Sequence, residues 1–146
     1  MSYLLLKFIH LTAAAFFIGG VFFEVMILSP AAHRLDQAPR EQLSKALGVR
    51  ARRVMHWVVL ALFGAGLGLA WQYRAVLHDP LASSFGTLLA LKIGLALSIL
   101  GQFSYVVYLM RTGRMTALRS RRIHISVLVH VLGILFLAKA MVLLSW

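Results

Sequence analysis

The stretch that most constrains this chain is its first long apolar run, from Tyr3 to Leu28. A helix of about 20 apolar residues crosses the roughly 30 Å hydrocarbon layer of a bilayer, so this run is long enough to span a membrane. It nevertheless contains Lys7, His10 and Glu24. Positions 3, 7, 10, 14, 17, 21 and 24 form one stripe on a helix, so the three ionisable side chains share a face. Ionisable groups at membrane depth are costly and usually face the interior of a bundle, so each is a candidate functional residue.

Three further apolar runs are long enough to cross a membrane. With the first run, the expected spans cover about residues 3–28, 54–76, 85–110 and 123–145. The chain has 146 residues, of which 61% are hydrophobic, whereas soluble domains are about 45–50% apolar. These features predict an all-α fold, an integral membrane four-helix bundle that forms a single transmembrane domain over residues 1–146. A short amphipathic helix is expected at about residues 39–50, entered at Pro39, because proline is tolerated in a first helical turn.

Small residues on two of these runs have the spacing of close helix contacts. Gly64 and Gly68 are four residues apart on the second run, and Gly94 and Ser98 have the same spacing on the third. Small residues at this spacing let neighbouring helices approach closely in lipid. We therefore expect both pairs to pack against other helices.

The basic residues lie between the apolar runs, which makes the net charge of +11 an indicator of membrane topology rather than of nucleic-acid binding. The first connection contains Arg34, Arg40, Lys45, Arg50, Arg52 and Arg53, and the third contains Arg111, Arg114, Arg119, Arg121 and Arg122. Positively charged loops stay in the cytoplasm, so both connections are expected there and both termini outside. The sequence thus predicts a multi-pass protein of the bacterial inner membrane. The absence of cysteine excludes disulfides, thiolate metal sites and iron–sulfur clusters.

Polar side chains within the runs fall into two layers when sequence position is converted into depth at about 1.5 Å per residue. The outer layer contains Lys7, His10 and Lys92, and the inner layer contains Glu24, His56, Gln102 and His130, with His124 at the rim. Histidines on different helices of a membrane bundle are well suited to ligate haem iron. His10, His56 and His130 are therefore the candidate iron ligands, and nearby cations would pair with the haem propionates.

Each of these residues also has a plain structural interpretation. Lys7 can extend to the nearby interface, and His10 or His130 can be a hydrogen-bonded structural histidine. Glu24 can pair with a basic neighbour or act as a proton-transfer group with a shifted pKa. Lys92 lies too deep to reach the interface easily, so a functional role is favoured for it.

The order and spacing of several residues resemble the CopD/HemJ-like family of four-helix membrane proteins. The resemblance rests on Lys7-Phe8-Ile9-His10 followed by Gly20, on Arg52-Arg53, on Lys92 and on Arg122, and it touches all four runs. The family includes HemJ-type protoporphyrinogen oxidases and CopD-type copper-resistance proteins. The resemblance implies b-type haem bound through His10, with Lys92 as the intramembrane lysine and Arg53 and Arg122 as the family's arginines.

These observations favour a b-type haem-binding inner-membrane redox protein that transfers electrons between the quinol pool and a partner. The candidate cofactor-binding residues are His10, His56, His130, Lys92, Arg53, Arg122 and His124, and the catalytic candidates are Lys92 and Glu24. Two alternatives stay open, a HemJ-like protoporphyrinogen oxidase and a copper-handling or transport protein of the CopD type, so enzymatic activity stays open too. The partners expected are the lipid bilayer, a quinone, a redox protein and further copies of the chain, and no nucleic acid.

Overall fold

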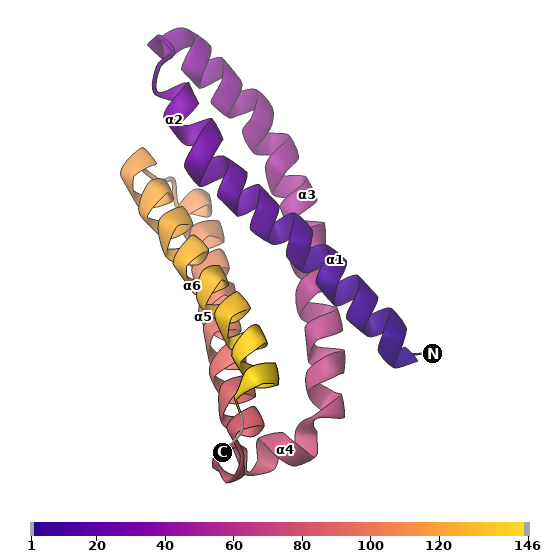
Figure 1. Ribbon diagram of the computed structural model, residues 1–146. Coiled ribbons are helices and arrows are strands. Elements are labelled where there is room, and N and C mark those ends of the chain that lie inside the picture. Colours follow the sequence, from indigo (N-terminus) through magenta and orange to yellow (C-terminus); the bar gives the residue numbers. More distant parts are fainter. Residues whose placement is uncertain (1, 145–146) are drawn as a thin grey trace. The chain divides into compact units, whose positions relative to one another are not determined.

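The computed structural model of the protein describes residues 2–144, and every regular element within that range is a helix. Four helices are long and apolar enough to cross a membrane: Ser2–Ala32, Gln37–Gln72, Ser84–Arg111 and Ala117–Leu143. This confirms the expected all-α fold, with four helices that are able to cross a membrane. Figure 1 shows two pairs of neighbouring helices, α1 with α3 and α5 with α6. Ser145, the expected end of the fourth span, lies outside the described residues.

A proline shapes the end of the first membrane helix. The elements are α1 (Ser2–Phe23), a π-helical turn (Glu24–Leu28) and α2 (Ser29–Ala32). Pro30 has no N–H group, and its ring crowds the carbonyl of the residue four positions earlier, Met26. The preceding turn is widened, so that the amide of Ser29 donates to the carbonyl of Glu24, five residues back. This widening lets the helix continue past the proline, and it places the half-buried Glu24 at the start of the widened turn.

The second membrane helix begins well before the apolar run. The helices that follow are α3 (Gln37–Gln72) and α4 (Arg74–His78). The sequence predicted a separate helix at 39–50 and a span at 54–76, but the structure joins them into α3. The residues between them, 51–53, include two arginines, which are good helix formers, and Pro39 lies in the first turn, where its missing N–H has no intrahelical partner. The helix ends before residue 76 because Tyr73 leaves the helical conformation, with ψ at 16°.

The α1–α3 pair forms one compact unit, Met1–Gln72. The two helices run antiparallel, and glycines mark their close contacts. Gly20 lies against Met55, Gly66 against His10 and Gly68 against Leu6. The expected Gly64–Gly68 contact is confirmed only for Gly68, because a Cβ at Gly64 would meet no described atom within 4 Å. The buried apolar residues of this unit are Ala13, Phe17, Val21, Val59 and Ala65.

The second compact unit, Tyr73–Trp146, contains α5 (Ser84–Arg111) and α6 (Ala117–Leu143). Both helices begin at a hydroxyl cap, since Ser83 accepts from the amide of Gly86 and Thr116 from the amide of Arg119. Helix α5 ends at Arg111, and Gly113 follows two residues later with a φ of 66°, in the left-handed region that glycine tolerates best. The amides of residues 113 and 114 donate to the carbonyls of residues 110 and 109, a Schellman arrangement that satisfies the end of the helix.

The α5–α6 seam keeps one antiparallel register over its whole length. Leu95 lies against Gly133, the hydroxyl of Ser98 lies 3.1 Å from the His130 ring, and the hydroxyl of Ser84 donates to the carbonyl of Leu144. In all three pairs the residue numbers have the same sum, so neither helix bulges or slips. The expected close contact at Gly94 is absent, since a Cβ there would meet no described atom within 4 Å.

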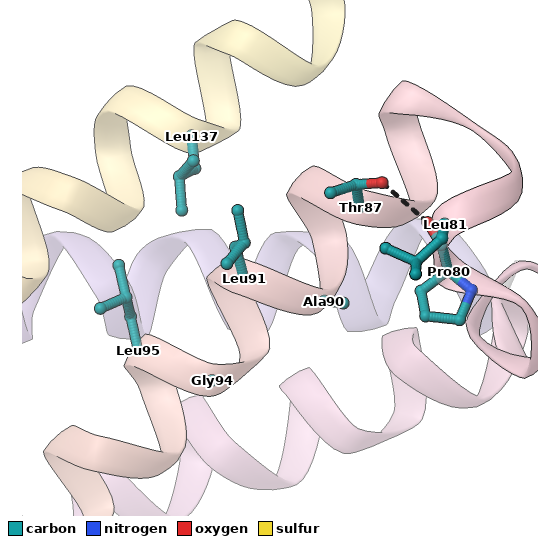
Figure 2. Close-up of a pocket in the computed structure, with 8 residues that line it drawn as sticks. All are labelled: Pro80, Leu81, Thr87, Ala90, Leu91, Gly94, Leu95 and Leu137. Carbon is teal, nitrogen blue, oxygen red and sulfur yellow. Dashed lines mark hydrogen bonds between the residues drawn. The ribbon is translucent and has the colours of Figure 1, made fainter.

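An open groove of about 500 Å³ lies at the Pro80 end of this second unit. Figure 2 shows the residues that line it: Pro80, Leu81, Thr87, Ala90, Leu91, Gly94, Leu95 and Leu137. The hydroxyl of Thr87 is the polar side-chain group among them, and it donates to the carbonyls of Pro80 and Ser83. The lining therefore has no titratable side chain, and the groove has the apolar character of a surface that contacts lipid tails.

The seam register can be tested by cross-linking, because the chain has no cysteine of its own. Cysteines at Leu95 and Gly133 should bridge on oxidation, since a Cβ at Gly133 would lie 3.2 Å from a methyl group of Leu95. Trypsin can cut in the arginine-rich connection between the helices, so a bridge holds the two fragments together on a non-reducing gel. The matched control pairs Leu95→Cys with Leu135→Cys, about 200° further around α6. Equal bridging in both pairs would contradict the register.

Candidate functional site

His10 is the histidine that links two membrane helices. Its side chain is half-buried, and its Nδ1 lies 3.0 Å from the carbonyl oxygen of Leu62 on α3. A carbonyl oxygen can only accept, so Nδ1 carries the proton and donates. In the neutral ring the lone pair is then on Nε2, which is the nitrogen that would ligate a metal. The contact thus fixes both the orientation of the ring and its tautomer.

Gly66 makes room for this histidine. A Cβ at position 66 would lie 3.2 Å from Cε1 and 3.3 Å from Nδ1 of His10, which is closer than ordinary van der Waals contact between carbon atoms. The Leu62 carbonyl also faces the amide of residue 66 within α3, and a carbonyl has two lone pairs, so it can accept from the ring as well. The sequence alone does not distinguish Gly66, since its importance depends on which α1 residue lies opposite.

The other intramembrane histidines donate to their own helices. Nδ1 of His56 lies 2.6 Å from the Arg52 carbonyl, Nδ1 of His124 lies 2.9 Å from that of Ser120, and Nδ1 of His130 lies 2.8 Å from that of Ser126. Each acceptor is four residues earlier on the same helix. All three rings therefore carry the proton on Nδ1, like His10, but they do not join one helix to another through this bond.

His130 joins α5 to α6 through its second nitrogen. Its Nε2 lies 3.1 Å from the hydroxyl oxygen of Ser98. Because Nδ1 carries the ring proton, Nε2 is the acceptor and the serine hydroxyl donates. Both nitrogens of His130 are thus occupied by hydrogen bonds, which supports the structural interpretation of this residue.

Gln102 lies one turn further along the same seam. Its Oε1 atom is buried and has no hydrogen-bond donor among the described residues. On α5 it follows Ser98 by four residues, and the register of the seam places it level with Ser126 of α6. The seam thus contains three hydroxyl or amide side chains and one imidazole in a small part of an otherwise apolar surface.

The α1–α3 unit does not bring its candidate residues into one site. His56 is ten residues from Gly66 along α3, which corresponds to about 15 Å. His10 and His56 are therefore too far apart to be the two axial ligands of one iron. Arg53 is a further turn away, at about 20 Å from the level of Gly66. Glu24 lies beyond the α-helical part of the first span, in the widened turn.

The α5–α6 unit also separates its candidates. His124 and His130 are six residues apart, so they differ by about 9 Å in height and about 120° in direction. Arg122 lies at the exposed start of α6, close to His124 in sequence but not to His130. Lys92 is half-buried on α5 and is about 9 Å along the helix from Ser98.

Lys7 and Met55 have direct structural explanations. The ammonium of Lys7 lies 5.9 Å from the centre of the Tyr3 ring, within the range of a cation–π interaction. Met55 packs against Gly20, as a flexible thioether that fills a gap does. Among residues 2–144, no three histidine, aspartate or glutamate side chains are grouped closely enough to hold one metal ion.

Comparisons of the chain with models of known protein families, with curated proteins and with solved structures find no significant match. The resemblance to the CopD/HemJ-like family therefore stays a prediction that rests on the residues named above.

The role of Gly66 can be tested by adding a single methyl group. Gly66→Ala should lower the free energy of unfolding by about 1–3 kcal/mol, because the new Cβ overpacks the contact with the His10 ring. Gly64→Ala is the matched control, two residues away on the same helix. It should be neutral or stabilise by up to about 1 kcal/mol, because alanine is the better helix former. Thermal unfolding of both variants in detergent measures the difference, and equal effects would contradict the close contact at His10.

Proposed function

We propose that the chain binds b-type haem within the membrane through His10 and serves as an electron-transfer protein. The observation that supports this most directly is the hydrogen bond from His10 Nδ1 to the Leu62 carbonyl. Metal-ligating histidines almost always donate their other ring N–H to a carbonyl or carboxylate, which orients the ring and raises its basicity as a ligand. His10 has this arrangement, and its acceptor is on a different helix.

The residues around His10 fit an axial ligand better than those around the other histidines. His130 accepts from Ser98 with Nε2, so ligation there would break the bond that joins α5 to α6. His56 is exposed and donates within its own helix. Gly66 gives His10 a position that a larger residue would close, and the ring is then held between two helices. We therefore assign the iron ligand to His10 rather than to His56 or His130.

The chain contributes orientation and electrostatics to this site. Bound haem supplies the one-electron couple. The Leu62 carbonyl polarises the His10 ring, and Lys7, one turn earlier on the same stripe, adds a positive charge that favours the reduced state. The apolar surfaces of both helices exclude water. A quinol of the membrane is the proposed electron donor, and a redox protein is the proposed acceptor.

We also propose the membrane orientation of the chain. The first and third connections contain six and five basic residues, whereas the second connection has Arg74 alone close to it. Positively charged connections remain on the cytoplasmic side. In this orientation the first and third connections lie in the cytoplasm and both termini outside. The membrane that we propose is a bacterial inner membrane. The structure contains the two helix pairs from which the proposed bundle would be built, α1 with α3 and α5 with α6.

The haem proposal is tested by the reduced-minus-oxidised absorption spectrum of protein purified in detergent from haem-sufficient cells. The wild-type protein should show b-type bands, and His10→Ala should lose them because the iron ligand is gone. His33→Ala is the matched control, since His33 is exposed and donates to its own helix at Ser29. In His10→Gly, added imidazole should restore the bands by occupying the vacated position, which distinguishes lost ligation from lost folding.

Two results would contradict the haem proposal. If the wild-type protein has no b-type bands, it does not bind haem b. If His10→Ala retains the bands, another residue is the iron ligand. Copper in the metal analysis of a haem-free preparation would instead favour the copper-handling alternative, and rescue of a strain that lacks protoporphyrinogen oxidase would favour the HemJ-like one.

The orientation is tested by labelling single cysteines with a membrane-impermeant maleimide. Asp79→Cys and Gln42→Cys replace exposed residues of the second and first connections in a chain without native cysteine. In intact spheroplasts Asp79→Cys should react at once, and Gln42→Cys should react only after permeabilisation. The reverse pattern would contradict the proposed topology.

A further inference from the structure

One face of α3 is directed away from α1 near the basic end of the helix. Met55 contacts Gly20 of α1, and Trp57 is two residues further along, which corresponds to a rotation of about 200°. Trp57 is 70% exposed, in agreement with that direction. The residues on the same stripe are Arg50, Arg53, Trp57, Leu60, Leu67 and Trp71.

This stripe has the composition of a surface that crosses a lipid leaflet. Leu60 is 63% exposed, and Leu67 and Trp71 are each 70% exposed. Trp57 and Trp71 are about 21 Å apart along the helix. Tryptophan is enriched near both interfaces of a membrane. The two rings are closer together than the roughly 30 Å thickness of the hydrocarbon layer, so Trp57 lies within a few Å of the boundary between hydrocarbon and headgroups, on the hydrocarbon side.

Two arginines lie just beyond that boundary. Arg53 and Arg50 follow Trp57 toward the basic end at about 6 Å and about 10 Å, from where their long side chains extend to the lipid phosphates. A hollow of about 300 Å³ lies on this face, lined by Ala46, Val49, Arg50, Arg53, Val54 and Trp57. Its lining thus combines two guanidinium groups with an apolar floor and an aromatic ring.

The two guanidinium groups have no carboxylate partner among residues 2–144. The acidic residue on the same helix, Glu41, accepts a hydrogen bond from Gln37 instead. Guanidinium groups bind phosphate through paired hydrogen bonds, and clusters of basic residues beside a membrane helix attract anionic lipids. A phosphate group is therefore the anion that best fits these two arginines.

We propose that Arg50 and Arg53 bind the phosphate of an anionic phospholipid, whose acyl chain follows Trp57 and Leu60 along α3. The lipid belongs to the leaflet on the side of the basic connections. Because the continuous helix holds both arginines at a constant height above Trp57, the site selects the headgroup by charge and by depth. This site is separate from His10 and does not depend on haem.

The proposal is tested with the purified full chain, by native mass spectrometry and by titration with phosphatidylglycerol or phosphatidylcholine of identical acyl chains. The wild-type protein should bind phosphatidylglycerol at least about tenfold more tightly. Arg50→Gln with Arg53→Gln should weaken phosphatidylglycerol binding by roughly thirty-fold and leave phosphatidylcholine binding unchanged. Arg40→Gln with Lys45→Gln is the matched control, because it removes the same charge from other faces of α3 and should change binding less than about threefold.

Three results would overturn the proposal. Equal losses in the two double variants would show a general effect of charge rather than a site. Equal wild-type affinity for the two lipids would show that the headgroup is not recognised. Displacement of phosphatidylglycerol by a soluble acidic peptide at lower concentration would assign the surface to a protein partner. Circular dichroism confirms that each variant is folded before its binding is compared.

Discussion

Polar side chains inside a membrane must find their partners within the protein, because no water is available in the hydrocarbon layer. This constraint explains what the histidines do. His56, His124 and His130 each donate to a carbonyl four residues earlier, which satisfies Nδ1 of the ring within its own helix. His10 instead donates across to α3. Its hydrogen bond contributes to the contact between two helices, and it fixes the tautomer of the ring.

The first span shows how much of the fold follows from sequence periodicity. The stripe that contains His10 was expected to face another element, and Phe17 and Val21 on that stripe are buried, while His10 contacts α3. Spacing on one helix was a poorer guide to glycine contacts. Gly64 and Gly68 have the expected spacing, yet the glycine that receives His10 is Gly66. Which glycine matters depends on the register of the opposite helix, and a single sequence does not contain that register.

The ends of the helices could not be read from hydrophobicity for a different physical reason. Hydropathy marks where the lipid begins, but a helix ends only where its backbone is interrupted. Arginine and lysine continue a helix well, so α3 extends through the basic segment to Gln37. In the first span, Pro30 falls within the apolar run, and the backbone accommodates it through a π-helical turn. Neither feature changes the apolar pattern, so the pattern could not predict them.

The continuity of α3 has a consequence for function. A flexible basic loop would let its arginines sample many heights above the membrane, whereas one helix keeps Arg50 and Arg53 at a constant rise from Trp57. Along the same helix, these arginines lie about 20 Å or more from the level of Gly66. The family resemblance connects Arg53 with the cofactor, but we propose that Arg53 binds the headgroup of a lipid. Lys7, one turn from His10 on α1, is the cation closer to the level of the His10 site.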